Sequence, residues 1–548
     1  MLRKTTRGIA ALAGVALAST LALTGCASTD DKAASGEGGS DVVTTDPINI
    51  GTTDKVLSLD PAAAYDNGSF AVAINVYPML MGVPAGGNKI EPDIAESAEF
   101  SDPSTYEVKL KKGLKFANGH DLTAEDVKFS FDRMNKINHP EGPQSLLANL
   151  EETKVVDDTT VQFKLKAEND QTFPQILTTP AALILDSEVF SADEITPADK
   201  IVSEKAFAGP YIITNYQENS SVSYERNPDY QGLYPAKNEL INVEYLANET
   251  NLKQKVEKSE IDVAYRSLSP TAIEDLKKNA ADKLNVVEGP GGEVRYMVFN
   301  SDSMPFGAKT PDADPAKALA VRQAIADTID RQAISDNVFK GTYTPVYSMV
   351  PEAMPGSDQS YKSEYGDGKG GPSVEKAKSR LDEAGVSTPV TLTIQYSPDH
   401  YGKSSADEYA AIKQQLEESN LFKVELQSTA WTTYSEERIA SYPIYQLGWF
   451  PDFSDADNYL SPFFLDENFV QSYNSALDES FQKHIKAATV ETDADKREEE
   501  LQNAQKELAK HVLTLPMLSG VQIAVAQKNV EGVVLDASFK FHYSSLTK

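Results

Sequence analysis

Two hydrophobic patterns alternate along most of the chain. Apolar residues at every second position predict strands, and apolar residues at every third or fourth position predict helices. The expected strands are a hairpin at residues 106–116, a second hairpin at 154–166 that turns at Asp157 and Asp158, and single strands at 390–396 and 423–428. The expected helices are one that begins after Thr123 and others at 315–339, 373–384, 405–421 and 493–513. This alternation of strands and helices predicts an α/β layered architecture.

The N-terminus combines a basic start, an apolar run and a cysteine. The apolar run at residues 9–23 is shorter than the roughly 20 residues that cross a bilayer. It therefore predicts a signal peptide over residues 1–25 and not a permanent membrane span. Leu23-Thr24-Gly25-Cys26 resembles a bacterial lipobox, and Cys26 is the only cysteine of the chain. We expect cleavage before Cys26 and lipidation of its sulfur, with a buried free cysteine as the alternative.

The net charge limits the possible partners, and the length of the chain indicates more than one lobe. Residues 26–46 are polar and rich in glycine and serine, which is typical of a flexible tether after the lipidated cysteine. The chain has 82 acidic and 51 basic residues, a net charge of -31. This acidity argues against nucleic acid or an anionic lipid surface as a partner, because basic patches bind both. The 548 residues are too many for one hydrophobic core, so we expect two or three lobes.

Enzyme signatures are weak. No G-x-S-x-G motif occurs, and the six histidines lack the spacing of a metal site, so we expect no cofactor and no metal. The stretch LGWFPDFSDADNYL at residues 447–460 places Asp452, Asp455 and Asp457 among aromatic residues. Such a cluster suits a catalytic acid/base pair, a metal loop or a loop that holds a ligand. An EF-hand loop does not fit, because Asp457 occupies the sixth position, where that loop needs glycine.

Binding is the interpretation that remains, and several segments support it. The segment LKFANGHDLTAEDVKFSFDRM at residues 114–134 resembles the central signature of the extracytoplasmic solute-binding proteins of peptide-type ABC importers, the dipeptide/oligopeptide-binding family. Further segments similar to this family are at residues 58–66, 209–232, 261–270, 294–306, 321–334 and 447–460. The resemblance thus runs along the whole chain after the tether.

The resemblance implies a fold of two α/β lobes that close on a ligand like a clamp. On this map lobe I comprises residues 47–290 with an extra subdomain, lobe II comprises residues 291–514, and residues 515–548 return to lobe I. Both predicted hairpins and the helix after Thr123 would lie in the extra subdomain. We therefore expect the signature segment at 114–134 to be structural and not to contact ligand.

The resemblance also implies a ligand site around Asp452. In peptide-binding relatives the carboxylate three residues after the tryptophan of this motif pairs with the α-ammonium group of the ligand, and Asp452 has that position. An amine that enters a closing cleft needs an anionic partner. The alternative is that Asp452 only caps a turn. Asp455 and Asp457 are expected to accept hydrogen bonds from the loop backbone, and Trp449 and Phe450 to form apolar walls, with a core position as the alternative for Trp449.

Other candidate contacts lie in loops far away in the sequence. His400, in the loop SPDHYGKS, has a position that some relatives fill with arginine or histidine, so it is the candidate for the carboxylate end of a peptide. An ordinary surface histidine is the alternative. Tyr65 and Asp66 follow SLDP in a loop that lines the cleft from lobe I in relatives. Arg266 and Arg438 are further cations that no motif places.

The sequence thus predicts a monomeric receptor, anchored by lipid to the outer face of the cell membrane. We expect it to bind short peptides and to deliver them to the permease and ATPase subunits of an ABC importer. Two alternatives stay open. One is another solute on the same fold, such as an oligosaccharide or a metal chelate. The other is a secreted hydrolase that uses Asp452 with Asp455 or Asp457 as acid and base.

Overall fold

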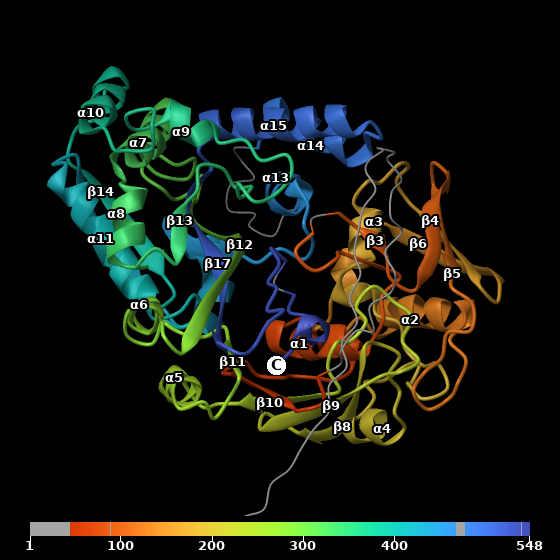
Figure 1. Cartoon of the computed structure of the whole chain (residues 1–548). Coiled ribbons are helices and arrows are strands. Elements are labelled where there is room, and N and C mark those ends of the chain that lie inside the picture. The colour runs from red at the N-terminus through yellow and green to blue at the C-terminus, as the bar shows by residue number, and fades with distance from the viewer. Residues whose placement is uncertain (1–43, 88, 467–476, 539) are drawn as a thin grey trace, which may run out of the picture. The chain divides into compact units, whose positions relative to one another are not determined.

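A computed structural model describes residues 44–87, 89–466, 477–538 and 540–548 (Figure 1). The signal peptide, Cys26 and nearly all of the tether lie outside these residues, so the expectations for them stay predictions. None of the helices in the described part of the chain combines the length and the apolar character that crossing a bilayer requires.

One mixed sheet of eleven strands forms the centre of the fold. Its order is β15-β14-β16-β12-β17-β11-β1-β10-β9-β8, and β13 also pairs with β17. These strands are β1 (Ile48–Thr52), β8 (Tyr211–Gln217), β9 (Ser221–Arg226), β10 (Leu240–Tyr245), β11 (Val263–Tyr265), β12 (Leu284–Phe299), β13 (Tyr343–Pro345), β14 (Val390–Tyr396), β15 (Phe422–Ser428), β16 (Ile444–Trp449) and β17 (Thr514–Gln527).

The long strands β12 and β17 join the two halves of this sheet. They pair antiparallel from Leu284 opposite Gln527 to Val298 opposite Thr514 (Figure 1). β11 lies beside one end of the pair, and β16 lies beside the other. The register shifts around Gly291. The next residue, Gly292, has no room for a side chain, because a Cβ atom there would lie 1.8 Å from the carbonyl oxygen of Ala537. The predicted boundary between the two lobes, at residue 290, falls inside β12. The residue boundaries of the lobes stay a prediction.

Helices pack on each half of the sheet around separate hydrophobic clusters, one with Ile50 and Val243 and one with Val321 and Leu392. The α-helices are α1 (Asn67–Val76), α2 (Ala124–Ile137), α3 (Phe173–Ile176), α4 (Ala198–Ser203), α5 (Glu249–Glu257), α6 (Pro270–Asn279), α7 (Pro315–Thr328), α8 (Arg331–Asn337), α9 (Ser360–Glu364), α10 (Val374–Glu383), α11 (Ser404–Glu418), α12 (Trp431–Ser441), α13 (Ser461–Phe464), α14 (Glu479–Val490) and α15 (Ala494–His511). Short 3-10 helices are η1 (Pro61–Ala63), η2 (Gln144–Leu147), η3 (Pro180–Ala182), η4 (Ala456–Tyr459) and η6 (Tyr543–Ser545).

A smaller sheet of four strands, in the order β4-β5-β7-β6, forms a third cluster with α2. Its strands are β4 (Ala95–Asp102), β5 (Thr105–Leu110), β6 (Leu150–Asp157) and β7 (Thr160–Leu165), and a separate two-stranded sheet pairs β2 (Met81–Gly82) with β3 (Glu91–Pro92). The predicted hairpin at 154–166 is confirmed as β6 and β7. The predicted start of α2 is also confirmed, because the carboxylate of Asp126 accepts a hydrogen bond of 2.9 Å from the backbone N–H of Thr123.

Two expected elements are wrong. The predicted hairpin at 106–116 does not form, because β5 pairs with β4 and β7 instead. β4 exposes most of its side chains, so it lacks the apolar alternation that predicts a strand. The helix expected at 315–339 is two helices, α7 and α8. They are separated because Ile329 is extended and the side chain of Asp330 accepts a hydrogen bond from the N–H of Ala333, which starts a new helix.

Candidate binding cavity

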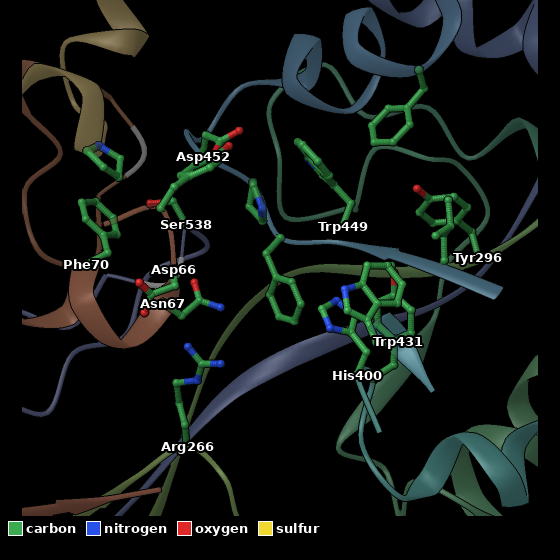
Figure 2. A pocket seen from close by; sticks show the side chains of 18 of the residues that line it. Asp66, Asn67, Phe70, Arg266, Tyr296, His400, Trp431, Trp449, Asp452 and Ser538 are labelled. Atoms are coloured by element: carbon green, nitrogen blue, oxygen red, sulfur yellow. The ribbon is translucent and has the colours of Figure 1, made fainter. Parts of the chain in front are cut away.

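A cavity of about 550 Å³ brings together all six residues that the sequence predicts as ligand contacts: Tyr65, Asp66, His400, Trp449, Phe450 and Asp452. Figure 2 labels Asp66, His400, Trp449 and Asp452 among them. Its other walls are Asn67, Phe70, Pro180, Arg266, Tyr296, Tyr401, Trp431, Arg438, Leu447, Gly448, Pro451, Phe463 and Ser538. Mostly apolar walls with a few polar groups are typical of a site for a small ligand. That each residue contacts ligand stays a prediction.

Asp452 lies in the loop that follows β16, and its half-buried carboxylate faces the cavity. The hydroxyl of Tyr65 donates a hydrogen bond of 2.5 Å to Oδ1. Burial raises the pKa of Asp452, while the hydrogen bonds from Tyr65 and Asn458 and the positive charge of Lys540 act in the opposite direction. The next residue, Phe453, is only 4% exposed and packs in the cluster of the four-stranded sheet. The hydrogen bond from Tyr65 and the packing of Phe453 therefore both fix the position of this loop.

Asn458, in η4, connects Asp452 with Trp449. Its Oδ1 accepts hydrogen bonds from the backbone N–H of Asp452 at 3.0 Å and from Nε1 of Trp449 at 3.1 Å. Its Nδ2 donates to Oδ2 of Asp452 at 3.4 Å. The indole of Trp449 also meets the ring of Phe463 edge to face, with 5.0 Å between centroids. One amide side chain thus orients both the carboxylate and the indole that the W-x-x-D spacing predicts as ligand contacts.

The other two aspartates of this loop do not line the cavity. Asp455 accepts a hydrogen bond of 2.8 Å from the backbone N–H of Asp457, as predicted, and its two oxygens pair with Arg497 at 2.8 and 2.9 Å. The backbone contact predicted for Asp457 is wrong, because its carboxylate accepts from the hydroxyl of Ser461 at 2.6 Å. Burial, followed by the charge of Asp455, raises the pKa of Asp457 to about 7.

Tyr65 and Asp66 reach the cavity from the segment between η1 and α1. The buried pair of Asp60 and Arg133, with 2.8 Å between Oδ1 and Nη1, ties this segment to α2. No residue of 114–134 lines the cavity, and the expectation that this segment is structural and does not contact ligand stays a prediction. Asp66 caps α1 by accepting a hydrogen bond of 2.9 Å from the N–H of Ser69. Burial raises the pKa of Asp66.

His400 and a second tryptophan, Trp431, lie together on the side of the cavity that is opposite Asp452 (Figure 2). Its ring stacks on Trp431 with 3.7 Å between centroids and 7° between planes. Burial lowers the pKa of His400, and the charge of Arg438 lowers it further, while Asp399 acts in the opposite direction. Burial and the charge of Arg438 therefore favour the neutral imidazole, and the structure gives it an aromatic partner that the sequence analysis did not predict.

The sequence analysis missed most of the aromatic wall. Tyr296, Tyr401 and Trp431 come from β12, a loop and α12, and no motif connects them. One signal was available, since the chain has only two tryptophans, Trp431 and Trp449, and both line this cavity. In the part of the chain that the structure describes, no group of three or more histidine, cysteine, aspartate or glutamate side chains is arranged to hold a metal ion.

An α/β fold in which distant segments enclose one aromatic cavity is typical of a protein that binds a small ligand. The chain belongs to family 5 of the bacterial extracellular solute-binding proteins, because the model of the middle region of that family matches residues 89–471. This confirms the family that the sequence resembles, with its two-lobed fold. Proteins of this family are transport receptors and not enzymes, which excludes the hydrolase alternative.

Similar proteins differ in the ligands that their names give. The oligopeptide-binding protein OppA of Bacillus subtilis is 24% identical over 531 residues, which cover 93% of this chain and 94% of OppA. Heme-binding protein A of Haemophilus influenzae is 26% identical, over 87% of this chain and 88% of that protein. A solved dipeptide-binding protein from Pseudoalteromonas sp. SM9913, in complex with Met-Leu, matches with a TM-score of 0.71 at 21% identity, over 92% of this chain and 100% of that one.

Proposed function

We propose that this protein is a peptide receptor of an ABC importer. It binds short peptides by their termini and main chain and delivers them to permease and ATPase subunits. It acts as a monomer at the outer face of the cell membrane, to which lipidated Cys26 anchors it. Family membership and the names of several relatives support this function, and the surroundings of Asp452 support a ligand with an amino group.

The observation that carries the proposal is the charge balance at Asp452. Its carboxylate is half-buried at the cavity wall, and no arginine or lysine of the described residues lies within 4.0 Å of it. A desolvated carboxylate is costly unless a partner compensates its charge. The α-ammonium group of a peptide supplies a positive charge and three hydrogen-bond donors at this position, and Tyr65 already occupies one acceptor site of the carboxylate.

The rest of the cavity suits the body of a peptide. Trp449 and Phe450 offer apolar surface beside the carboxylate, and Tyr65 and Asp66 approach from the predicted lobe I. The hydrogen bond between Tyr65 and Asp452 joins the two predicted lobes directly. A ligand that touches both sides of the cavity stabilises the closed arrangement, and the importer distinguishes the loaded receptor by that shift in population.

The first test is mass spectrometry of the ligand that the protein retains after exposure to a pool of synthetic di- and tripeptides. The second compares the best retained peptide with its N-acetylated form by calorimetry, on wild type and on Asp452→Asn. Breaking a buried ion pair costs about 3–5 kcal/mol, which is roughly two to three and a half decades in affinity. Because Asp452 is only half-buried, the loss of affinity should be smaller than this.

The acetylated peptide is the control for this experiment. Acetylation removes the charge that Asp452 recognises, so the wild type should prefer the free amine, and Asp452→Asn should bind both forms about equally weakly. A wild type that binds both forms equally well disproves the role of Asp452. Retention of a heme, a sugar or a metal chelate in place of peptide would show that the same fold serves another solute.

A further inference from the structure

Lys540 is a buried lysine of the segment that follows β17. The residue is only 2% exposed. Its Nζ donates one hydrogen bond, of 3.4 Å, to Oγ1 of Thr178, and no carboxylate of the described residues lies within ion-pair distance of Nζ. An ammonium group has three donors, and a buried charge is costly unless other charges compensate it. The charge of Lys540 is therefore balanced by carboxylates that lie beyond direct contact.

The neighbours of Lys540 place it behind the part of the cavity wall that holds Asp452. Ser538, two residues before Lys540, lines the cavity and lies on the same side as Asp452 in Figure 2. Pro180, two residues after the hydrogen-bond partner Thr178, lines the cavity as well. Lys540 itself is not one of the lining residues. Its ammonium group thus lies under the wall, where its charge acts on a ligand site that its atoms do not reach.

Two carboxylates share the charge of Lys540: Asp536, behind the wall, and Asp452, in the wall. Asp536 is 6% exposed, and its Oδ1 accepts hydrogen bonds of 3.0 Å from the backbone N–H groups of Ser538 and Lys540. Burial raises the pKa of Asp536, and the charge of Lys540 acts in the opposite direction. At Asp452 too, burial raises the pKa and the charge of Lys540 acts against it. One lysine therefore favours the ionised form of both carboxyls.

The histidine and the tyrosines that face these three groups carry no charge near neutral pH. His542 stacks on Tyr234 with 3.7 Å between ring centroids. Burial, followed by the charge of Lys540, lowers the pKa of His542 to about 3. Burial raises the pKa of each tyrosine that is close to one of the carboxylates, namely Tyr65, Tyr234, Tyr265 and Tyr459. Two carboxylates and one lysine thus leave a single net negative charge at this part of the wall.

We propose that Lys540 is a positioning residue that sets the charge of the empty site, so that the wall offers one negative charge to one ammonium group of the ligand. Without Lys540, two buried carboxyls would lie close together with no cation between them. Such a pair takes up a proton, because like charges in a buried site disfavour double ionisation. The ligand amine would then have to displace that proton. This inference rests on the proposed peptide function and adds to it a residue that acts through Asp452.

The test counts the protons that are exchanged when peptide binds. Calorimetric titration with the best retained peptide, in two buffers of different ionisation enthalpy, gives this number at about pH 6.5, where the α-amino group is still charged. Wild type should release almost no proton. Lys540→Met should release about one proton per peptide, so its affinity should fall about tenfold for each unit by which the pH is lowered. Adding Asp536→Asn to Lys540→Met restores the net charge and should abolish the release.

Thr178→Val is the matched control, because it removes the hydrogen-bond acceptor of Lys540 and leaves every charge in place. It should release no more protons than wild type, and circular dichroism verifies that each variant is folded. The proposal is wrong if Lys540→Met releases no more protons than wild type, if Thr178→Val releases as many as Lys540→Met, or if the double variant still releases one. These results leave the peptide function intact, since wild type binds peptide in each of them.

Asp536→Asn decides the question if Lys540→Met does not fold. Asparagine keeps an acceptor for the two backbone N–H groups but removes one of the carboxylates that balance Lys540. The lysine charge then opposes the ligand amine at Asp452, so affinity should fall at least roughly tenfold. An affinity equal to that of wild type disproves the proposal. If wild type itself retains no peptide, the peptide function fails and this inference fails with it.

Discussion

Replacing Asp457 by asparagine should stabilise the protein at alkaline pH. Asp457 is 5% exposed, and the pKa of its carboxyl rises from 3.8 to about 7, first through burial and then through the charge of Asp455. The folded protein therefore holds this proton more tightly than the unfolded chain does. Its free energy of unfolding consequently falls as the pH rises from about 3.8 to about 7.

The size of the effect follows from the same two values. Each pKa unit corresponds to about 1.4 kcal/mol, so ionised Asp457 destabilises the fold by up to about 4 kcal/mol above pH 7. Asparagine keeps the shape and an acceptor for Ser461 but carries no charge. The advantage of Asp457→Asn over wild type should thus grow by about 2 to 3 kcal/mol between about pH 5 and pH 8.

Urea unfolding followed by tryptophan fluorescence at both pH values measures this difference. Asp455→Asn is the comparison in the same loop, because it removes a buried partner of Arg497 and should destabilise by about 3–5 kcal/mol at pH 5. Its effect should be smaller at pH 8, since it also removes a charge that raises the pKa of Asp457. The reasoning is refuted if the difference between wild type and Asp457→Asn is the same at pH 5 and pH 8, since the native carboxyl would then not hold a proton.

Two further predictions concern the positioning of the site and the anchor. Asn458→Ala removes the acceptor shared by Trp449 and Asp452, so ligand affinity should fall by roughly tenfold, about 1.4 kcal/mol, and the tryptophan emission should shift. Unchanged emission and affinity in a titration followed by fluorescence would contradict this positioning role. Cys26→Ala should release the protein from membranes, and the prediction fails if the variant stays bound through high-salt and carbonate washes.

Local signals in the sequence predicted those elements whose stabilising contacts are also local. Thr123 and Asp126 are three residues apart and define the start of α2, and the alternating residues of β14 gave its bounds at 390–396. The central pairing of β12 with β17 joins segments more than 200 residues apart. No periodicity within either segment identifies the partner strand, so the continuous sheet was not predictable from pattern alone.

The residues of the cavity also fall into two groups, those that a local motif predicts and those that only packing brings together. Asp452, Trp449 and Phe450 were found because they belong to one short motif, and the cavity does contain them. Trp431 and Arg438 belong to α12, which exposes many polar side chains and gives no motif. Their meeting with His400 depends on how α12 packs beside the loop after β14. Residues that become neighbours only through packing leave no spacing in the sequence to detect.

The three aspartates of the loop after β16 illustrate how packing, and not residue type, assigns their roles. Asp455 is compensated by Arg497, and the raised pKa of Asp457 lets that buried carboxyl keep its proton up to about pH 7. Asp452 alone faces the cavity, where no lysine or arginine of the described residues is within ion-pair distance. Divergent pKa values among neighbouring carboxyls often indicate acid/base catalysis, but catalysis requires that both groups reach the substrate. Here two of the three charges are removed from the cavity by pairing or protonation, so the negative charge that this loop presents to a ligand comes from Asp452. This loop therefore brings one carboxylate to the cavity without a second group for acid/base chemistry, and the binding of a ligand cation by Asp452 stays a proposal.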